Sequence, residues 1–426
     1  MRCHLCWIVA LIVCVFALLL YVGSKFIPPL APDSITIATG SKDGIYYQSA
    51  LKYKELLSKE RVDVKIVPTR GSVEALGLLK SGKADIAFMQ SGTGERFKDE
   101  PFTSLASIYN EPIWVYYRAD DKKLEYLSQL KGKRVVVGEI GSGTKELAVA
   151  LLNANGVDQE NTTFLNLDVK AGAQALFDNE ADALFSVIGT FAPLTKALIL
   201  EPKIELMNFL RQDAYDVKFS YLNSIALYEG VLDLEHNLPA EQKKLICTTA
   251  TLVSTDSLHP DIIRLILQAA TKVHTQSSIF REEGEFPTAD RIEFVINPHA
   301  QIYLRDGDSW LEQIFPFWVA SIIKRVALLL VPVLALMIPI VKIIIPAFSW
   351  HSRSKIYRWY KTLDSVNEQL DTLDKSEIKE AISKLEAELQ EAKLVDVPLS
   401  YRREYYDLME HFDMLLNKLY AKECKE

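Results

Sequence analysis

The stretch SITIATGSKDGIYYQSALKYKELLSK, residues 34–59, contains the change of hydrophobic period that decides the fold. SITIA alternates as a strand does, GSKDG interrupts it, and the remainder has helical spacing, with Tyr46 and Tyr53 on one face. A strand VKIVP, a helix GSVEALGLLKSG and a strand ADIAFMQ follow. We expect Ser72 to cap this second helix and Gly82 to end it.

The same order of elements recurs further along the chain. KRVVVGEI predicts a strand, GSGT a glycine loop and KELAVALLNANG a helix that ends at Gly156. The strand TTFLNLDV, the helix AGAQALFDNE and the strand ADALFSVIG come next, and EALGLLKSGKADIAF aligns with QALFDNEADALF once a short gap is allowed. Each copy is a βαβαβ unit, with parallel strands and right-handed crossovers. Two copies predict an α/β protein with two lobes.

Both glycine loops lie between a strand and the following helix, where helix N-termini present free N–H groups and anions bind. If the lobes face each other, residues 40–46 and 141–144 close on a shared anionic group, and hinge closure buries it. A phosphate-binding P-loop is disfavoured because Thr144 precedes Lys145, the reverse of the required order, and residues 38–44 lack the dinucleotide spacing.

Composition excludes several function classes. The chain has 426 residues, which indicates more than one folding unit, and 48 basic against 56 acidic residues, which does not favour a nucleic-acid partner. Three of the five cysteines crowd the N-terminus, so no disulfide framework follows. The histidines of the middle region show neither a metal-ligand spacing nor a nucleophile and base pairing: His236, His259, His274 and His299. We predict no enzyme, no catalytic residue, no cofactor and no metal.

Two apolar runs predict membrane helices. Residues 5–22 carry no charge and would span about 27 Å at about 1.5 Å per residue; a cleavable signal peptide is the alternative. Residues 326–345 are interrupted by Lys342 alone among charged residues, and a buried core helix is the alternative.

The flanking charges predict the orientation. The cluster after the second run favours a cytoplasmic tail, although Lys324 and Arg325 argue the other way: His351, Arg353, Lys355, Arg358 and Lys361. With both termini inside, the middle of the chain lies outside the membrane.

The tail itself repeats apolar residues at helical spacing, which predicts a helical hairpin or short antiparallel bundle. The apolar stripes are Ile356, Tyr360, Leu363, Val366, Leu370 and Leu373, then Ile378, Ile382, Leu385 and Leu389, then Tyr405, Met409, Phe412, Leu416 and Leu419.

Several ordered motifs carry a family resemblance: ATGSKDGIYYQSA, TRGSVEALGLLKSGKADIAFMQ, SIYNEPIWVYYR, VGEIGSGTKELA, LPAEQKKLICTTATLVSTDSLHPDIIRLILQAATKVH and the FP of GEFPTAD. In these residues the chain resembles the TAXI family of solute-binding proteins, which serve TRAP transporters. The resemblance covers residues 34–317. A C-terminal span and KIYRWYKTL extend it to about residue 363 and resemble the membrane-anchored subgroup.

The resemblance implies a periplasmic two-lobed receptor of the type II periplasmic-binding-protein-like fold. Such a receptor binds a small organic anion, often an amino acid or dicarboxylate, and delivers it to a TRAP-type membrane permease subunit. Carried over by position, the implied ligand-binding residues are Gly40, Ser41, Gly44, Ile45 and Tyr46, facing Ser142, Gly143 and Thr144, with Ser72 and Gln90 beside them.

Three charged residues leave alternatives open. Lys42 and Asp43 stand where the family frequently has glycine; they form either an ion pair at the mouth of the cleft or a solvated turn, and we expect the turn. Glu111 of YNEPIW lies either near the hinge or in a solvated loop.

The expected organisation has four parts. Residues 1–32 are a transmembrane anchor or signal, 33–315 the two-lobed domain, 316–348 a transmembrane helix and 349–426 a cytoplasmic helical tail. Lobe 1 is expected at 33–118 and 220–310, and lobe 2 at 119–219. We expect a bacterial inner-membrane protein whose binding domain lies in the periplasm. The tail helices could also join copies of the chain into a homo-oligomer. An uptake receptor is preferred to a sensor that relays ligand binding through the tail to a cytoplasmic partner.

Overall fold

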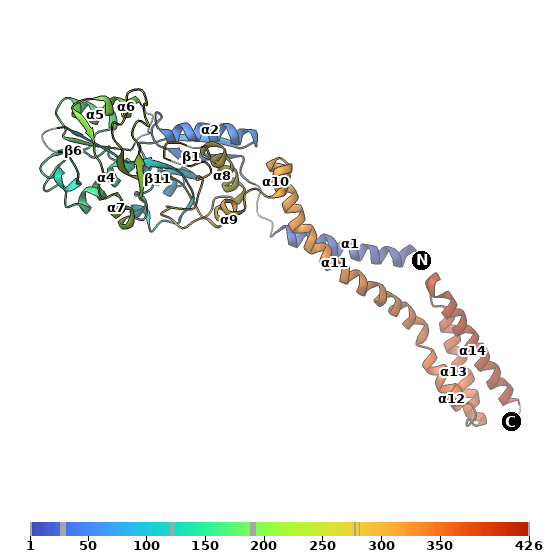
Figure 1. Cartoon of the computed structure of the whole chain (residues 1–426). Coiled ribbons are helices and arrows are strands. Elements are labelled where there is room, and N and C mark those ends of the chain that lie inside the picture. The colour runs from blue at the N-terminus through green and yellow to red at the C-terminus, as the bar shows by residue number, and fades with distance from the viewer. Residues whose placement is uncertain are drawn as a thin grey trace. The chain divides into compact units, whose positions relative to one another are not determined.

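A computed structural model describes residues 2–25, 31–119, 123–187, 193–276, 278–280 and 282–424 (Figure 1). The chain divides into two units. Pro29–Ser321 form an α/β unit, and Met1–Pro28 with Ile322–Glu426 form a helical unit.

The first sheet of the α/β unit has six strands in the order β10-β11-β3-β1-β2, with β4 also paired to β11. These strands are β1 (Ser34–Thr39), β2 (Asp63–Pro68), β3 (Ile86–Gln90), β4 (Phe102–Pro112), β10 (Asn223–Leu227) and β11 (Lys243–Thr255). β1 runs parallel to β2 and β3, and β11 runs antiparallel to its neighbours. The accompanying helices are α2 (Ile45–Lys59), α3 (Ser72–Lys80), α7 (Gln212–Lys218), α8 (Pro260–His274) and α9 (Pro298–Asp306). We call this half lobe 1.

The second sheet has five strands in the order β7-β6-β8-β5-β9. They are β5 (Trp114–Arg118), β6 (Arg134–Val136), β7 (Thr163–Leu165), β8 (Ala183–Ser186) and β9 (Ile204–Leu206), accompanied by α4 (Gly143–Ala154), α5 (Val169–Phe177) and α6 (Pro193–Leu200). We call this half lobe 2. β6 lies between β7 and β8, both parallel to it, as β1 lies between β2 and β3. The prediction of two βαβαβ units is therefore confirmed.

The expected lobe boundary after residue 118 is wrong. β5 pairs with β8 and β9, so it belongs to lobe 2, and the chain leaves the first sheet at Ile113, one residue after β4 ends. The chain also returns to lobe 1 before residue 220, because α7 packs against β10 and β11. Both errors arise because strand partners lie far away in the sequence, and an apolar run does not reveal which sheet it joins.

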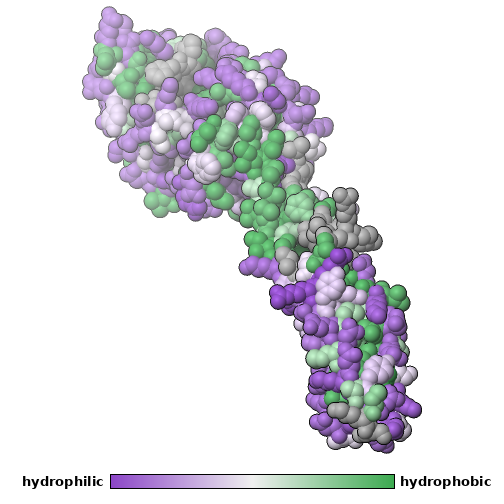
Figure 2. Space-filling view, turned by 90° about the vertical axis from the view of Figure 1, so that its right-hand side faces the viewer, coloured by the Kyte–Doolittle hydropathy of each residue, from purple (hydrophilic) through white to green (hydrophobic). Residues whose placement is uncertain are grey.

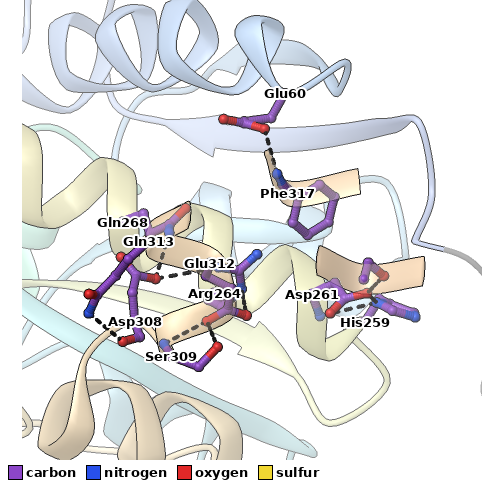
Figure 3. A network of polar contacts seen from close by, with 11 residues as sticks. Glu60, His259, Asp261, Arg264, Gln268, Asp308, Ser309, Glu312, Gln313 and Phe317 are labelled. Atoms are coloured by element: carbon purple, nitrogen blue, oxygen red, sulfur yellow. Dashed lines mark hydrogen bonds and ion pairs between the residues drawn. The ribbon is translucent and has the colours of Figure 1, made fainter. Parts of the chain in front are cut away.

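The last part of the α/β unit anchors the start of a long helix to lobe 1 (Figure 3). α10 (Trp310–Ile314) begins with a capping box in which the Ser309 N–H donates to Glu312 at 2.8 Å. The Glu312 side chain is 4% exposed and lies 2.9 Å from the Arg264 guanidinium of α8, which also lies 3.4 Å from Asp308. The Phe317 N–H donates to Glu60 at 3.2 Å. The first turn of α11 (Phe317–Tyr357) is thereby fixed to lobe 1.

The helical unit contains a compact bundle with its own apolar core. α12 (Tyr360–Gln369), α13 (Lys375–Lys393) and α14 (Arg402–Glu423) pack through the predicted stripes, with Ile378, Leu385 and Phe412 fully buried. An Asp374 capping box starts α13. The predicted helical bundle is confirmed.

Among the described residues, α11 is the one helix whose length and composition suffice to cross a membrane. Its most apolar window has a mean hydropathy of 2.8 and is 12% buried, and Figure 2 shows its apolar surface. α1 (Arg2–Ser24) includes the shorter apolar stretch Val13–Ser24, so the first predicted span stays a prediction.

Candidate functional site

The N-termini of α3 and α4 meet where the two lobes touch. A Cβ atom added at Gly71, which precedes α3, would lie 2.8 Å from Ser142 Cα. One added at Gly143, the first residue of α4, would lie 3.0 Å from both Gln90 Cβ and Ser72 Oγ of lobe 1. Glycine at both positions therefore permits the close approach of the lobes.

Gly71 also has a backbone conformation that other residues rarely adopt, with φ of +149°. Thr69 holds this conformation: its hydroxyl accepts a hydrogen bond from the Gly71 N–H at 3.1 Å and donates to the Thr39 carbonyl at 2.6 Å. The end of β1 and the start of α3 are thus joined side by side.

Ser72 does not cap α3, contrary to expectation. Gly71 is the N-cap residue, and Ser72 is the first helical residue. The Ser72 hydroxyl instead accepts a hydrogen bond from the Gln90 main-chain N–H at 2.9 Å. The first N–H groups of α3 therefore receive no side-chain cap.

Gln90 ends β3 and is 5% exposed. Its side-chain nitrogen, Nε2, is buried without a hydrogen-bond partner among the described residues. An unpaired buried amide costs about 1–3 kcal/mol, so this donor favours binding of an acceptor.

In lobe 2, Ser142 caps α4. Its hydroxyl accepts from the Lys145 N–H at 3.2 Å and donates to the Glu139 carbonyl at 2.7 Å. Both hydrogen bonds of the Ser142 hydroxyl are therefore made within its own loop and the first turn of α4. Buried Gly143 and half-buried Thr144 begin the helix.

The loop at residues 40–44 is not among the nearest contacts of the α4 N-terminus. Gly71 and Ser72 lie closest to residues 141–143, and the expectation that residues 40–46 face residues 141–144 stays a prediction. In the 40–44 loop, the Gly44 N–H donates to the Ser41 carbonyl at 2.9 Å, and Gly40 lies against the Tyr46 ring. Ser41 and Ile45 are exposed.

Asp43 meets lobe 2 at α5, where it lies 3.2 Å from Lys170. Both side chains are largely exposed. The expected solvated turn is confirmed, because Lys42 and Asp43 lie in an exposed turn. Asp43 in addition forms an ion pair across the lobes, although such an exposed pair contributes little stability.

Tyr46 is the residue of its loop that reaches the contact region. Its hydroxyl donates to Glu111 Oε2 at 2.8 Å, and its ring stacks on Phe88 with centroids 5.4 Å apart. Burial, followed by the nearby Glu111 and Tyr109, raises the Tyr46 pKa, while a hydrogen bond with Ser72 acts in the opposite direction. Glu111 thus lies at the carboxyl end of β4 beside the hinge, and not in a solvated loop.

A second carboxyl group, that of Glu293, was not predicted. It accepts hydrogen bonds from the main-chain N–H groups of Gly92 and Gly94, which follow β3. Burial raises the pKa of Glu293 to about 7. No local motif in the sequence indicates this contact, because about two hundred residues separate the partners.

No group of three or more His, Cys, Asp or Glu side chains in the described part of the chain is arranged to hold a metal ion.

Comparison with known proteins gives a family and several structural likenesses. The periplasmic aliphatic sulphonate binding protein SsuA from Escherichia coli is 12% identical over 57% of this chain and 70% of its own, with a TM-score of 0.40. The amino acid ABC transporter substrate-binding protein AbpA from Streptococcus pneumoniae, bound to L-arginine, is 14% identical over 57% and 89%, with a TM-score of 0.36.

The structure of arginine-bound, truncated ArgBP from T. maritima is 13% identical over 57% of this chain and 96% of that one, with a TM-score of 0.37. Residues 37–282 match the NMT1-like family. This match begins within β1 and includes the rest of both βαβαβ units and the N-termini of α3 and α4. The chain is a member of the NMT1-like family.

Proposed function

We propose that the α/β unit is an extracytoplasmic receptor of the type II solute-binding fold, which binds a small organic anion between its lobes. One observation carries this proposal: two helix N-termini, those of α3 and α4, meet beside the unpartnered side-chain amide of Gln90.

Electrostatics explains why this arrangement favours an anion. Each helix N-terminus carries a partial positive charge and unpaired N–H groups, so two that face each other repel. An anion bound at both N-termini removes the repulsion. It also accepts hydrogen bonds from the free N–H groups and from the Gln90 side-chain amide. Such a ligand contacts both lobes and favours their closure.

The membrane attachment is the second part of the proposal. We assign α1 and α11 as membrane helices. α1 and the part of α11 from Ile322 onward belong to the helical unit, where Gly23 of α1 lies against Leu329 of α11. A residue as small as glycine permits close packing of two membrane helices. The basic cluster near the end of α11 supports a cytoplasmic position for the three-helix bundle.

The likeness to TAXI proteins in the motifs of both lobes supports the finer assignment. The receptor would sit in a bacterial inner membrane and deliver its ligand, of the amino acid or dicarboxylate class, to a TRAP-type permease subunit. Residues 33–315 would be the receptor domain and residues 349–426 the cytoplasmic tail.

A sensor is the second candidate, and the junction in Figure 3 favours it. The first turn of α11 is fixed to lobe 1 through Arg264, Glu312 and Phe317, so a movement of lobe 1 would be transmitted to that turn. Deletion of residues 350–426 separates the two functions. Uptake that continues after this deletion with loss of a cellular response supports the sensor.

Thermal unfolding of the full chain in detergent, measured with a panel of amino acids, dicarboxylates and other organic acids, tests the receptor. A ligand at about 100 times its Kd stabilises the folded chain by about 2.7 kcal/mol. Gln90→Ala should weaken the binding of that ligand about fivefold, because one hydrogen bond of about 1 kcal/mol is lost. The matched control, Gln174→Ala on the exposed face of α5, should leave the affinity unchanged. Stabilisation by no acid in the panel, or equal affinity after Gln90→Ala, contradicts the proposal.

A further inference from the structure

The carboxyl group of Glu111 has an unusual set of partners. Its Oε2 accepts the hydroxyl hydrogen of Tyr46 at 2.8 Å. Within the described part of the chain, Tyr46 is its hydrogen-bond partner, and no lysine, arginine or histidine forms an ion pair with it. Among the described residues, the carboxyl group therefore has no cationic partner.

The surroundings of Glu111 disfavour its charged form. The side chain is half-buried at the end of β4, beside the stacked rings of Tyr46 and Phe88. Burial raises the pKa of Glu111 to about 8, although the Tyr46 hydrogen bond acts in the opposite direction. A charged carboxylate in such a place is stabilised by a nearby cation.

Glu111 also lies next to the N-terminus of α3. The Ser72 hydroxyl holds the Gln90 main chain at 2.9 Å and forms a hydrogen bond with the phenol of Tyr46, which in turn contacts Glu111. Two hydrogen-bond lengths, roughly 6 Å in all, therefore separate the Ser72 hydroxyl from the Glu111 carboxyl group. A single small molecule can reach both groups.

We propose that Glu111 binds a protonated amine of the ligand, so that the captured solute is a small zwitterion. Its acidic group lies at the N-termini of α3 and α4 with Gln90, and its ammonium group lies at Glu111. This inference rests on the proposed function, because it requires that the lobes bind an organic acid. A ligand with acidic groups alone would offer Glu111 no cation.

Binding should also release a proton near neutral pH. In the ligand-free protein Glu111 is largely protonated at pH 7, and pairing with an ammonium group favours its charged form. The neighbouring Tyr46 phenol and Cys247 thiol do not compete, since burial raises both of their pKa values. Glu285 raises and Arg291 lowers the pKa of Cys247.

The test uses acids in pairs that differ by one amino group. Isothermal titration of the full chain in detergent compares L-glutamate with glutarate, L-aspartate with succinate, and L-alanine with propionate. At least one amino acid should bind, and its partner without the amino group should bind 10- to 100-fold more weakly. Titrations in buffers of different ionisation enthalpy should show the release of nearly one proton at pH 7.

Two variants separate a specificity role from a structural one. Glu111→Gln keeps the size and the Tyr46 hydrogen bond but removes the charge, so it should lose the discrimination within each pair and the proton release. Glu205→Gln is the matched control, because Glu205 accepts a hydrogen bond from the Tyr117 hydroxyl in lobe 2. It should leave both affinities unchanged.

The outcomes distinguish this inference from the proposed function. Equal binding of an amino acid and its partner, or an equal loss of both in Glu111→Gln, overturns the inference and leaves the anion receptor intact. Binding of neither member of any pair contradicts the receptor of small organic acids, and this inference with it.

Discussion

Gly143→Ala should separate closure of the lobes from the stability of each lobe. Gly143 begins α4, and its backbone does not lie in the left-handed region, so lobe 2 by itself accepts alanine there. In the closed arrangement the new methyl group would lie 3.0 Å from Gln90 Cβ and 3.0 Å from Ser72 Oγ. Both contacts cross to lobe 1 and are shorter than van der Waals contact.

The magnitude follows from the cost of overpacking. An extra methyl group in a well-packed place costs about 1–3 kcal/mol, which weakens a ligand that requires the closed form about 5- to 150-fold. Alanine also favours the helix by up to about 1 kcal/mol relative to glycine. This gain raises the stability of lobe 2 without restoring the affinity.

The assay is isothermal titration of the acid that stabilises the wild-type chain most, together with thermal unfolding. Gly77→Ala is the first control, because nothing lies within 4 Å of its added Cβ, and it should keep the affinity. Gly172→Ala is the second control: its Cβ would lie 2.8 Å from Val136 Cγ1 inside lobe 2, so it should lower stability and not affinity. Wild-type affinity in Gly143→Ala would refute the closed geometry.

Three further predictions concern stability. Burial raises the pKa of Glu111 to about 8 and that of Glu293 to about 7, above the ordinary value of 4.5, so the stabilisation they contribute is complete below about pH 4.5 and is lost as the pH rises through 7 and 8. The free energy of unfolding without ligand should therefore fall between pH 5 and 8, and Glu111→Gln should reduce this fall. Arg264→Met removes the cation 2.9 Å from the buried Glu312 carboxylate and should cost about 3–5 kcal/mol in chemical denaturation, while Arg305→Met, which breaks an exposed pair, should cost less than about 1 kcal/mol. Phe412→Ala should destabilise the tail bundle by about 3–5 kcal/mol, seen as faster proteolysis of the tail, and leave ligand affinity unchanged.

Local patterns in the sequence were sufficient for most of the fold. The helix expected from Ile45 and the strands on either side of it are present, because period, glycine breaks and helix length all act within a few residues. The tail bundle followed equally from its apolar stripes. In each case the information is contained in neighbouring residues.

Contacts between distant segments were the part that the sequence did not reveal. The assignment of Trp114–Arg118 to lobe 1 failed because its pairing with β8 and β9 is not encoded nearby. Ser72 was expected to cap α3, but its hydroxyl is held by Gln90. The surroundings of Glu111 depend on Tyr46, which lies in a different element. The sequence around Glu111 was therefore compatible with a solvated loop and with a position near the hinge.

The most direct measurement of the central claim is an NMR titration of the full chain labelled with [¹⁵N]glycine, since 18 glycines give a spectrum that can be assigned. Addition of the stabilising acid should shift the amide resonances of Gly71 and Gly143 in a saturable manner, while Gly77 and Gly307 remain unchanged. Saturable binding that moves other glycines and leaves Gly71 and Gly143 unaffected would contradict an anion site at the N-termini of α3 and α4.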